Sequence, residues 1–382
     1  MAIHAARNYI LTLWSRRTDP PDNEGSGHDS RGHRPWGPKA GERSRSGLRD
    51  GRVVTPAGVP KEEGPERLEE HAPRIGIVIL NWNGWRDTME AVGSARALTY
   101  VNHRIYVVDN ASTDGSEEKL RAWDPTLNVI PSGGNLGWAG GNNAGIRAAL
   151  RDGCVHVLLL NNDAVLRPDS LTPLAAAAQS LPRAASAGSV IVDWRDPGRV
   201  EFGGCFIDPR THMPRHIHGR LDTLDLPRTP VPMPAVKGCA MLLTGTGLAR
   251  TGLLTEDYFL NFDEIDWCFR ARAAGLEHYL VARSIVGHKG AASFEGTESP
   301  LYRYFMTRNR LVFARRHLDR TGRWYAWRGA SWDLRQVLAG PKPDGPWSRS
   351  TLALAVLRAA ADYLLGRLGD CPSFIRTWNS RR

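Results

Sequence analysis

The 382-residue sequence has few cysteines and no long apolar run. Its five cysteines lie far apart and form no Cys-x-x-Cys pair, which argues against a zinc knuckle or a disulfide framework and favours a reducing cytoplasm. No stretch reaches the roughly 18 uncharged apolar residues that a membrane span requires. The longest candidate, residues 352–368, is interrupted by Arg358, Asp362 and Arg367. We therefore expect a cytoplasmic protein without a membrane span.

Residues 1–72 contain little that could build a core. From Asp19 to Ala72 the chain is rich in Gly, Pro, Ser, Arg and Glu and poor in aromatic residues. Such a segment buries too little apolar surface to offset the entropy lost on ordering it. The residues before it lack the apolar length and cleavage site of a secretory signal, although an organellar presequence or a surface helix are alternatives. We expect a disordered tail over residues 1–72.

The positive charge is concentrated in the C-terminal segment. The formal net charge is +10; residues 301–382 hold 16 Lys and Arg against 5 Asp and Glu (+11), residues 1–72 hold 12 against 11 (+1), and the middle is therefore about −2. Five of the 13 tryptophans lie in the same C-terminal segment: Trp324, Trp327, Trp332, Trp347 and Trp378.

Arginine together with tryptophan is typical of a surface that meets anionic lipid headgroups. A basic, Trp-rich helical extension over residues 301–382 therefore predicts peripheral contact with the inner face of the plasma membrane. Nucleic acid is the competing polyanion. A solvated helical face whose tryptophans lie in the core is the third interpretation. We expect no specific nucleic-acid partner.

Between these segments, apolar runs alternate with helical patterns. We expect strands at residues 75–80, 104–108, 127–130 and 155–160, and helices at residues 85–98, 114–123 and 138–151. Strands separated by helices of this length are typical of βαβ units and a parallel sheet. The pattern predicts an α/β, Rossmann-like domain over residues 73–300, with strands and loops over residues 188–244 and a helix over residues 263–275.

Asn and Asp gather where the expected strands end. The four strand-end segments are Asn81-Trp-Asn83, Asp109-Asn110, Ser132-Gly-Gly-Asn135 and Asn161-Asn162-Asp163. One Asn after a strand is ordinary turn chemistry. Four successive polar ends favour a rim around one crevice, because open α/β sheets bind ligands beyond the carboxyl ends of their strands.

Three groups of residues carry candidate chemistry. Asp163 is a candidate ligand for a Mg²⁺ or Mn²⁺ ion that bridges two phosphates, although it could instead cap a helix. Asp263, Glu264 and Asp266 begin the expected helix, where the helix dipole alone favours acids, but one of them, Glu264, is our candidate catalytic base. His288 follows an expected strand and is a candidate metal ligand, although a single histidine there is more often structural.

The motifs in combination resemble the inverting family 2 glycosyltransferases of GT-A fold. The matching stretches, in order, are Ile-Val-Ile-Leu-Asn-Trp-Asn-Gly, Val-Val-Asp-Asn-Ala-Ser-Thr-Asp-Gly-Ser, Asn-Leu-Gly-Trp-Ala-Gly-Gly-Asn-Asn-Ala-Gly-Ile, Leu-Leu-Asn-Asn-Asp and Asp263-Glu-Ile-Asp-Trp-Cys-Phe-Arg followed by His288. The likeness covers about residues 74–318, including Arg308-Asn-Arg310. It is greatest to the rhamnosyltransferase-type members.

The resemblance implies roles for individual residues. Asn81 and Asp109 would contact the nucleotide, Asp109 through its base, and Asn135, Asn143 and Asn162 would border it. Residues 161–163 fall on the family's metal-binding Asp-x-Asp triplet, so Asp163 and His288 would hold the metal. Glu264 falls on the catalytic base. Two departures stand out: Asn161 replaces the first acid of the triplet, and the usual Glu-Asp pair is Asp263-Glu264.

The resemblance implies a metal-dependent, inverting glycosyltransferase that moves a sugar from a nucleotide diphosphate donor to a hydroxyl of a glycan or lipid-linked acceptor, in cell-surface glycan or glycoconjugate synthesis. On resemblance alone, dTDP-rhamnose is the first donor to consider. The alternatives are a nucleotide-sugar-binding protein with impaired catalysis and a sugar nucleotidyltransferase. The latter should carry a Gly-rich loop with Arg and Lys after its first strand, where this chain has Asn81-Trp-Asn-Gly.

Overall fold

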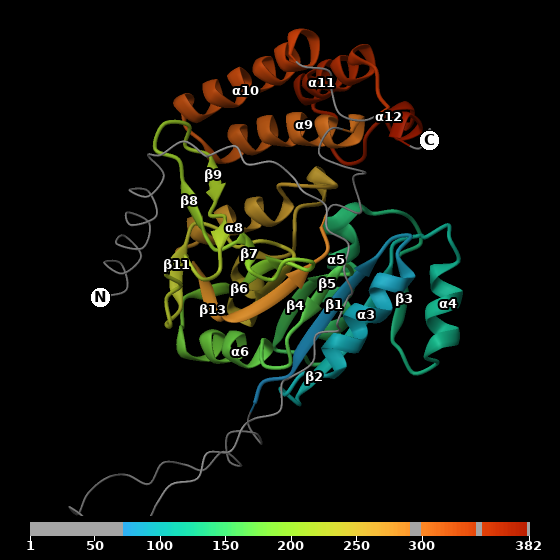
Figure 1. The fold of residues 1–382 in the computed structure, drawn as a ribbon, viewed down its shortest axis with the longest axis vertical. Helices are drawn as coiled ribbons and strands as arrows, with labels where there is room; N and C mark the ends of the chain where they lie inside the picture. Colours follow the sequence, from blue (N-terminus) through green and yellow to red (C-terminus); the bar gives the residue numbers. More distant parts are fainter. Residues whose placement is uncertain (1–71, 291–298, 341–345, 380–382) are drawn as a thin grey trace, which may run out of the picture.

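A computed structural model describes residues 72–290, 299–340 and 346–379 of the chain. The predicted disordered tail, apart from residue 72, lies outside the described residues. The described chain forms one large mixed sheet flanked by helices, with a layer of further helices across one end (Figure 1).

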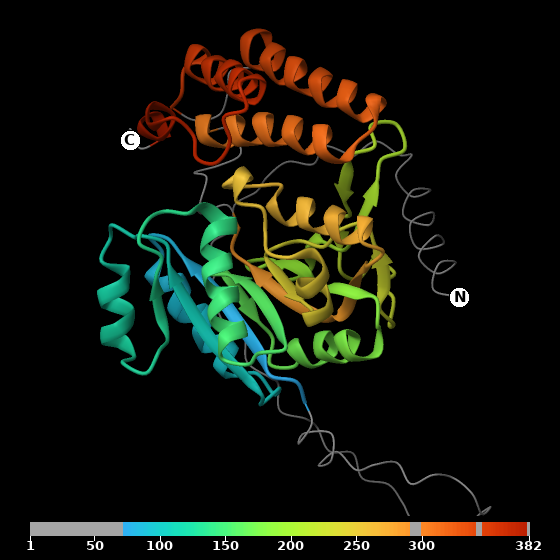
Figure 2. The same cartoon turned by 180° about the vertical axis from the view of Figure 1, so that it is seen from behind.

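The parallel half of the sheet follows the predicted alternation. Its strands lie in the order β4-β1-β2-β3 and are all parallel. They are β1 (Ile75–Asn81), β2 (His103–Asp109), β3 (Val129–Pro131) and β4 (His156–Asn161). The helices between them are α3 (Trp85–Arg96), α4 (Ser116–Trp123) and α5 (Gly137–Arg151). Figures 1 and 2 show α3 and α5 on opposite faces of the sheet.

The second half of the sheet is mixed. β12 (Ala240–Leu243) is antiparallel to both β4 and β6 (Ala184–Asp193), and β13 (Glu277–His288) is parallel to β6. The shorter strands of this sheet are β5 (Ala164–Leu166), β7 (Arg199–Phe202), β10 (Gly219–Arg220) and β11 (Val231–Met233). β8 (Cys205–Ile207) and β9 (Pro214–His216) form a separate hairpin, and α6 (Leu171–Ser180) and α7 (Gly245–Thr251) complete this half.

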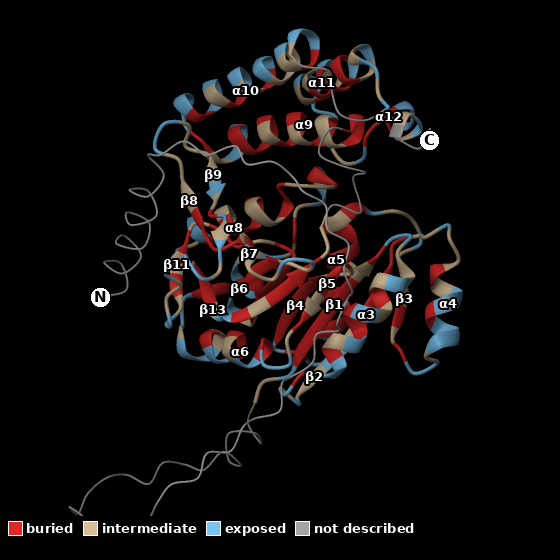
Figure 3. Ribbon diagram, in the orientation of Figure 1, coloured by how far each residue is buried: buried red, intermediate tan, exposed pale blue. Residues whose placement is uncertain are grey.

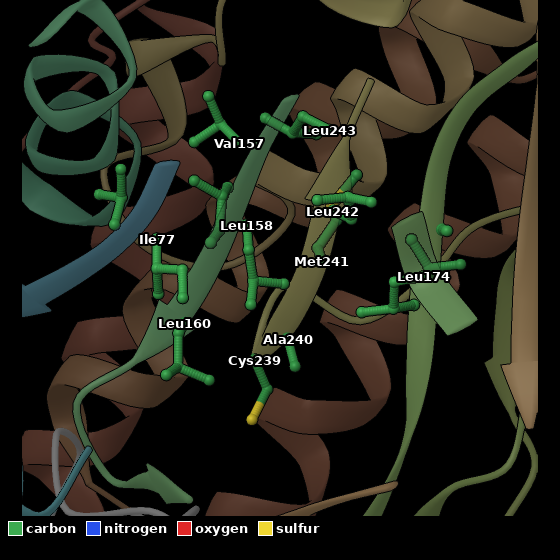
Figure 4. Packing of buried hydrophobic residues seen from close by; sticks show 14 of the residues in the cluster. Ile77, Val157, Leu158, Leu160, Leu174, Cys239, Ala240, Met241, Leu242 and Leu243 are labelled. Atoms are coloured by element: carbon green, nitrogen blue, oxygen red, sulfur yellow. The ribbon is translucent and has the colours of Figure 1, made fainter. Parts of the chain in front are cut away.

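The core lies around the central strands. Apolar side chains of β4 and β12 pack between β1 and α6 (Figure 4), and the middle of the sheet is buried on both faces (Figure 3). Two glycines let α5 approach β1 closely. A Cβ at Gly141 would lie 2.3 Å from Leu80, and one at Gly145 would lie 2.3 Å from Val78. These contacts fix the start of α5 beside the carboxyl ends of β1 and β2.

The described part of residues 301–382 is helical, as predicted. It comprises α9 (Pro300–His317), α10 (Arg320–Ala339), α11 (Arg349–Leu364) and α12 (Ser373–Asn379). α9 lies next to the main domain, and α10 and α11 form the outer layer (Figure 1). In the described ranges, no helix has both the length and the apolar character to cross a bilayer.

Candidate functional site

The carboxyl ends of β1 and β2 are joined by a buried polar network. Asn81 Nδ2 donates to Asp109 Oδ1 (2.7 Å) and to Ser112 Oγ (3.0 Å), and Thr88 Oγ1 donates to Asn81 Oδ1 (2.7 Å). Asn81 and Asp109 are both buried. The network fixes the turn after β1, whose residue Asn83 adopts a positive φ of 52°. Both predicted residues therefore meet at one sheet edge.

A crevice opens at this edge, with a volume of about 90 Å³. Its lining combines the strand ends with apolar and cationic side chains from later elements: Leu80, Trp82, Asn110, Asn135, Gly137, Trp138, Asn161, Asn162, Asp163, Phe259, Leu260, Leu301, Phe305 and Arg376. Asn110 Nδ2 donates to Asn135 Oδ1 (3.1 Å), and Trp138 Nε1 donates to Asn161 Oδ1 (3.1 Å). Four of the predicted strand ends thus surround one crevice.

Asp163 lines this crevice, and His288 lies behind it. His288 Nε2 is 3.5 Å from Asp163 Oδ1, and His288 Nδ1 is 2.8 Å from Glu201 Oε2. Glu201 is also 3.4 Å from Lys237 Nζ. Burial opposes a charged imidazole, but Cys239 and the two carboxylates raise the pKa of His288. Burial alone would raise the pKa of Glu201, but its contacts with His288 and Lys237 lower that pKa to about 2. The protein holds this ring tightly between two acids.

Glu264 begins α8 (Asp263–Ala273) close to the same crevice. A Cβ built at Gly238 would lie 2.8 Å from the Trp138 ring, which lines the crevice, and 3.4 Å from Glu264 Cβ. Glu264 is half-buried, and its burial raises the pKa of its carboxyl group. Neighbouring Lys237 opposes this shift. A carboxylate with a raised pKa beside a cavity suits a general base.

The two other acids at the start of α8 are placed differently. Asp263 is fully buried, its carboxylate oxygens have no hydrogen-bond partner among the described residues, and burial with the nearby Glu264 charge raises its pKa well above the usual range. Asp266 accepts hydrogen bonds from Tyr258 Oη (2.9 Å) and Thr255 Oγ1 (2.7 Å) and pairs with Arg270 and His317. Asp266 therefore anchors α8 and does not line the crevice.

Asn143 is also turned away from the crevice. Its Nδ2 donates to Leu254 O (3.0 Å) and Glu256 Oε1 (2.8 Å), and its Oδ1 accepts from Leu254 N (3.0 Å). The side chain joins α5 to the segment before the 3-10 turn Glu256–Tyr258. The side chain of Asn143, which we predicted to border the nucleotide, instead holds two parts of the protein together.

The loop that leads into α8 has an unusual backbone that α9 holds in place. Phe259, Asn261 and Phe262 have φ of 65°, 67° and 72°, a region that side-chain-bearing residues rarely occupy. Asn309 Nδ2 donates to the carbonyls of residues 258, 260 and 261 at 2.9, 2.7 and 3.0 Å. Arg308 Nη2 donates to Tyr258 O at 2.9 Å. Both α9 residues are buried, so they fix the position from which Glu264 projects.

A larger cavity of about 1150 Å³ lies on the other side of Glu264. It is open to solvent and bordered by the β8–β9 hairpin, the start of α8, α9 and α10. Its aromatic lining includes Tyr302, Tyr325 and Trp332, and its basic lining includes Arg210, Arg215, Arg310 and Arg328. Glu264 is thus within reach of a space large enough for a sizeable second molecule.

Three residues of this site had no recognisable signal in the sequence. Glu201 and Lys237 come from a short strand and a loop with no motif, and Arg376 comes from the last described helix. The pair Arg308-Asn309 lies within the family resemblance, but its support of the loop before α8 depends on contacts about 50 residues apart in sequence.

A mixed sheet with a polar crevice at the carboxyl ends of its parallel strands, followed by an acid-bearing helix, is the architecture of the GT-A fold. In agreement, a solved structure titled "Crystal structure of GalNAc-T7 with UDP, GalNAc and Mn2+" superposes with a TM-score of 0.52 at 15% identity, covering 77% of this chain and 57% of that one. At this identity the likeness establishes the fold.

Residues 76–233 match the model of the family described as "Glycosyl transferase family 2". Over these residues the chain matches the glycosyltransferase family whose motifs the sequence was predicted to resemble.

Two curated proteins are similar to the chain, each at 26% identity. One is the low-salt glycan biosynthesis hexosyltransferase Agl10 of Haloferax volcanii, with 52% of this chain and 61% of that protein covered. The other is an N-acetylglucosaminyl-diphospho-decaprenol L-rhamnosyltransferase of Mycobacterium tuberculosis, with 62% and 80% covered. The chain thus spans less than two thirds of the first relative's length. The predicted likeness to rhamnosyltransferase-type members is confirmed at this low identity.

Proposed function

We propose that this protein transfers a sugar from a nucleoside diphosphate donor to an acceptor hydroxyl, with inversion at the anomeric carbon. The observation that carries the proposal is the arrangement around Glu264. This carboxylate lies beside the crevice that Asp163 lines, with His288 against Asp163, and it lines the large cavity on its other side. The donor would occupy the crevice, with Asn135 and Asn162 of its lining beside the nucleotide and with Asn81 and Asp109 at the buried strand ends behind them. The acceptor would occupy the large cavity.

In this mechanism, Glu264 accepts the proton of the acceptor hydroxyl as its oxygen attacks the anomeric carbon. The bond between that carbon and the diphosphate breaks on the opposite face, and the nucleoside diphosphate leaves with the negative charge. The raised pKa of Glu264, caused by burial, makes its carboxylate a stronger base than an exposed one. Burial raises the pKa of neighbouring Asp263 well above its usual range, which favours the neutral form of that carboxyl group.

The residues present fit a divalent ion, Mg²⁺ or Mn²⁺. Among the described residues, no cluster of three or more His, Cys, Asp or Glu side chains forms a complete metal site. Asp163 and His288, 3.5 Å apart, would hold the ion together with oxygens of the donor diphosphate. Glu201 orients the His288 ring through Nδ1, and Nε2 then faces Asp163, which is the usual support for a histidine ligand. A bound ion would neutralise charge on the leaving diphosphate.

Among donors, we propose dTDP-rhamnose first, because one relative is named an L-rhamnosyltransferase. The same relative's name motivates an acceptor carried on a lipid diphosphate. The name of the Haloferax relative motivates a role in glycan synthesis, which we propose to serve the cell surface. The test measures sugar transfer from dTDP-, UDP- and GDP-sugars with Mn²⁺, using wild type and Glu264→Gln. We expect Glu264→Gln to lose about 10²- to 10⁴-fold in kcat while still binding nucleotide. Nucleotide binding without transfer in wild type would favour the impaired binding protein.

We also propose that the outer helices contact an anionic membrane. Trp324 and Trp332 of α10 are 55% and 59% exposed, and Leu364 of α11 is 69% exposed, within the most basic segment of the chain. Trp332 also lines the large cavity, so the same helix would bring a lipid-linked acceptor to it. Of the five C-terminal tryptophans, Trp347 and Trp378 instead pack against buried clusters.

The membrane proposal is tested by pelleting the whole chain with vesicles. Wild type should pellet with phosphatidylglycerol vesicles more than with phosphatidylcholine vesicles, and Trp324→Ala with Trp332→Ala should reduce this difference. Truncation is a poorer test because α11 packs against α9. Equal partition of wild type into both kinds of vesicle would refute the membrane proposal, and binding to nucleic acid instead would favour the competing polyanion.

A further inference from the structure

The crevice contains a single Lys or Arg among its lining residues in the described chain, and that residue comes from the last described helix. Arg376 belongs to α12, whereas the other polar lining residues follow the strands of the sheet. The acid of the lining is Asp163. The two charged side chains of the crevice thus come from different parts of the fold, one from the sheet and one from the C-terminal helices.

The contacts of α12 hold Arg376 at this place. Ile375, the preceding residue, is fully buried in the cluster formed by Phe259, Phe305 and neighbouring side chains. The Arg376 guanidinium lies over the Phe259 ring, 4.9 Å from its centroid, and its Nε is 3.2 Å from Asp370 Oδ2. Phe259 also lines the crevice and belongs to the loop before Glu264. Arg376 is therefore preset at the crevice and still 28% exposed.

A nucleoside diphosphate in this crevice would need cationic partners. One divalent ion held by Asp163 and His288 would face part of the diphosphate charge, and the charge would grow as the glycosidic bond breaks. A guanidinium suits the remaining oxygens because its planar N–H groups match phosphate geometry and remain charged at any working pH.

We propose that Arg376 binds the diphosphate of the donor and stabilises the leaving nucleoside diphosphate. The inference rests on the proposed donor site, and it extends that site to a helix of the C-terminal segment. The Phe259 ring supports the guanidinium, while Asp370 holds it until the phosphate oxygens compete for it. The C-terminal helices thereby complete the donor site.

The experiment measures the affinities of dTDP, UDP and GDP, and of the corresponding monophosphates, by calorimetry with Mn²⁺. The proteins are wild type, Arg376→Ala, Arg376→Lys and the control Arg367→Ala, which removes an exposed arginine that does not line the crevice. Arg376→Ala should bind the preferred diphosphate about 10- to 100-fold more weakly, the size of a lost charge-assisted contact, and the monophosphate much less so. Arg376→Lys should lie between, and Arg367→Ala should match wild type.

Asp370→Asn separates ligand binding from a purely structural role. It removes the carboxylate that competes with phosphate, so diphosphate affinity should be retained or increased. If Arg376 served only to fix α12, Asp370→Asn would weaken binding as Arg376→Ala does, and the proposal would be overturned. Equal diphosphate affinity in wild type and Arg376→Ala would also overturn it while leaving the donor site intact. A wild type that binds no nucleotide would overturn the proposed function itself.

Discussion

Replacing Asn309 by leucine should disable catalysis by releasing the loop that positions Glu264. The two N–H groups of Asn309 are shared among three carbonyls of residues 258–261, at 2.7 to 3.0 Å. Leucine keeps the volume, and Arg308 still donates to Tyr258 O, but the part-buried carbonyls of residues 260 and 261 lose their side-chain donor. At about 1–3 kcal/mol each, we expect a loss of about 2–6 kcal/mol. A domain with about 5–15 kcal/mol of stability still folds in most of that range.

The loss of activity should exceed what destabilisation explains. Phe259, Asn261 and Phe262 have positive φ angles that persist only while tertiary contacts hold them. Once the loop relaxes, Glu264 shifts, and a displacement of about 1 Å can reduce the rate about 10²-fold. Urea unfolding measures the stability of the variant, and steady-state transfer assayed well below its melting temperature measures kcat.

A matched control removes a comparable pair of hydrogen bonds far from the loop. Thr244 Oγ1 donates to Ala184 O (2.6 Å) and accepts from Gly247 N (2.9 Å), at the end of β12 remote from the crevice. Thr244→Val should lower stability but keep kcat. If Asn309→Leu loses stability but keeps its kcat, as Thr244→Val should, the loop does not position Glu264 for catalysis.

Three further outcomes follow from the structure. The acid limb of kcat should lie above the ordinary carboxylate pKa, because burial raises the pKa of Glu264 and activity requires its ionised form; an acid limb at or below pH 4 would contradict this. Asp266→Asn should cost about 3 kcal/mol at pH 7 in urea unfolding. Burial opposes ionisation of Asp266, but bonds from His317 and Arg270 lower its pKa. The stability that the ionised carboxylate contributes is therefore complete above the unfolded pKa of about 4 and declines as the pH falls toward the folded pKa. A loss of stability in Asp266→Asn that did not change with pH would contradict this assignment. Gly145→Ala should lower the melting temperature, with a loss of about 1–3 kcal/mol, because its Cβ would overlap Val78; an unchanged melting temperature would show that α5 can move away.

The parallel half of the fold was predictable because its signals are local. Continuous apolar runs form β1, β2 and β4, and each ends at Asn or Asp, so the sheet rule alone places these side chains at one edge. The observed helices α3 and α5 end within two residues of the predicted positions.

The rest of the site depends on contacts that no spacing encodes. Glu201 reaches His288 from 87 residues away, through the pairing of β6 with β7 and β13. Arg376 reaches the crevice because buried Ile375 fixes α12 against the Phe259 loop. The acid pattern at the start of α8 could not separate Glu264, which lines a cavity, from Asp266, which is paired, since both follow from the same helix-start preference.

The proposed active site combines a metal-bound diphosphate with a separate base in one pocket. A titration of Mn²⁺ followed by electron paramagnetic resonance tests this arrangement. With the preferred nucleoside diphosphate present, wild type and Glu264→Gln should bind one Mn²⁺ with equal affinity. Asp163→Asn should bind it at least tenfold more weakly. Unchanged Mn²⁺ affinity in Asp163→Asn would contradict the assignment of the crevice as the donor site.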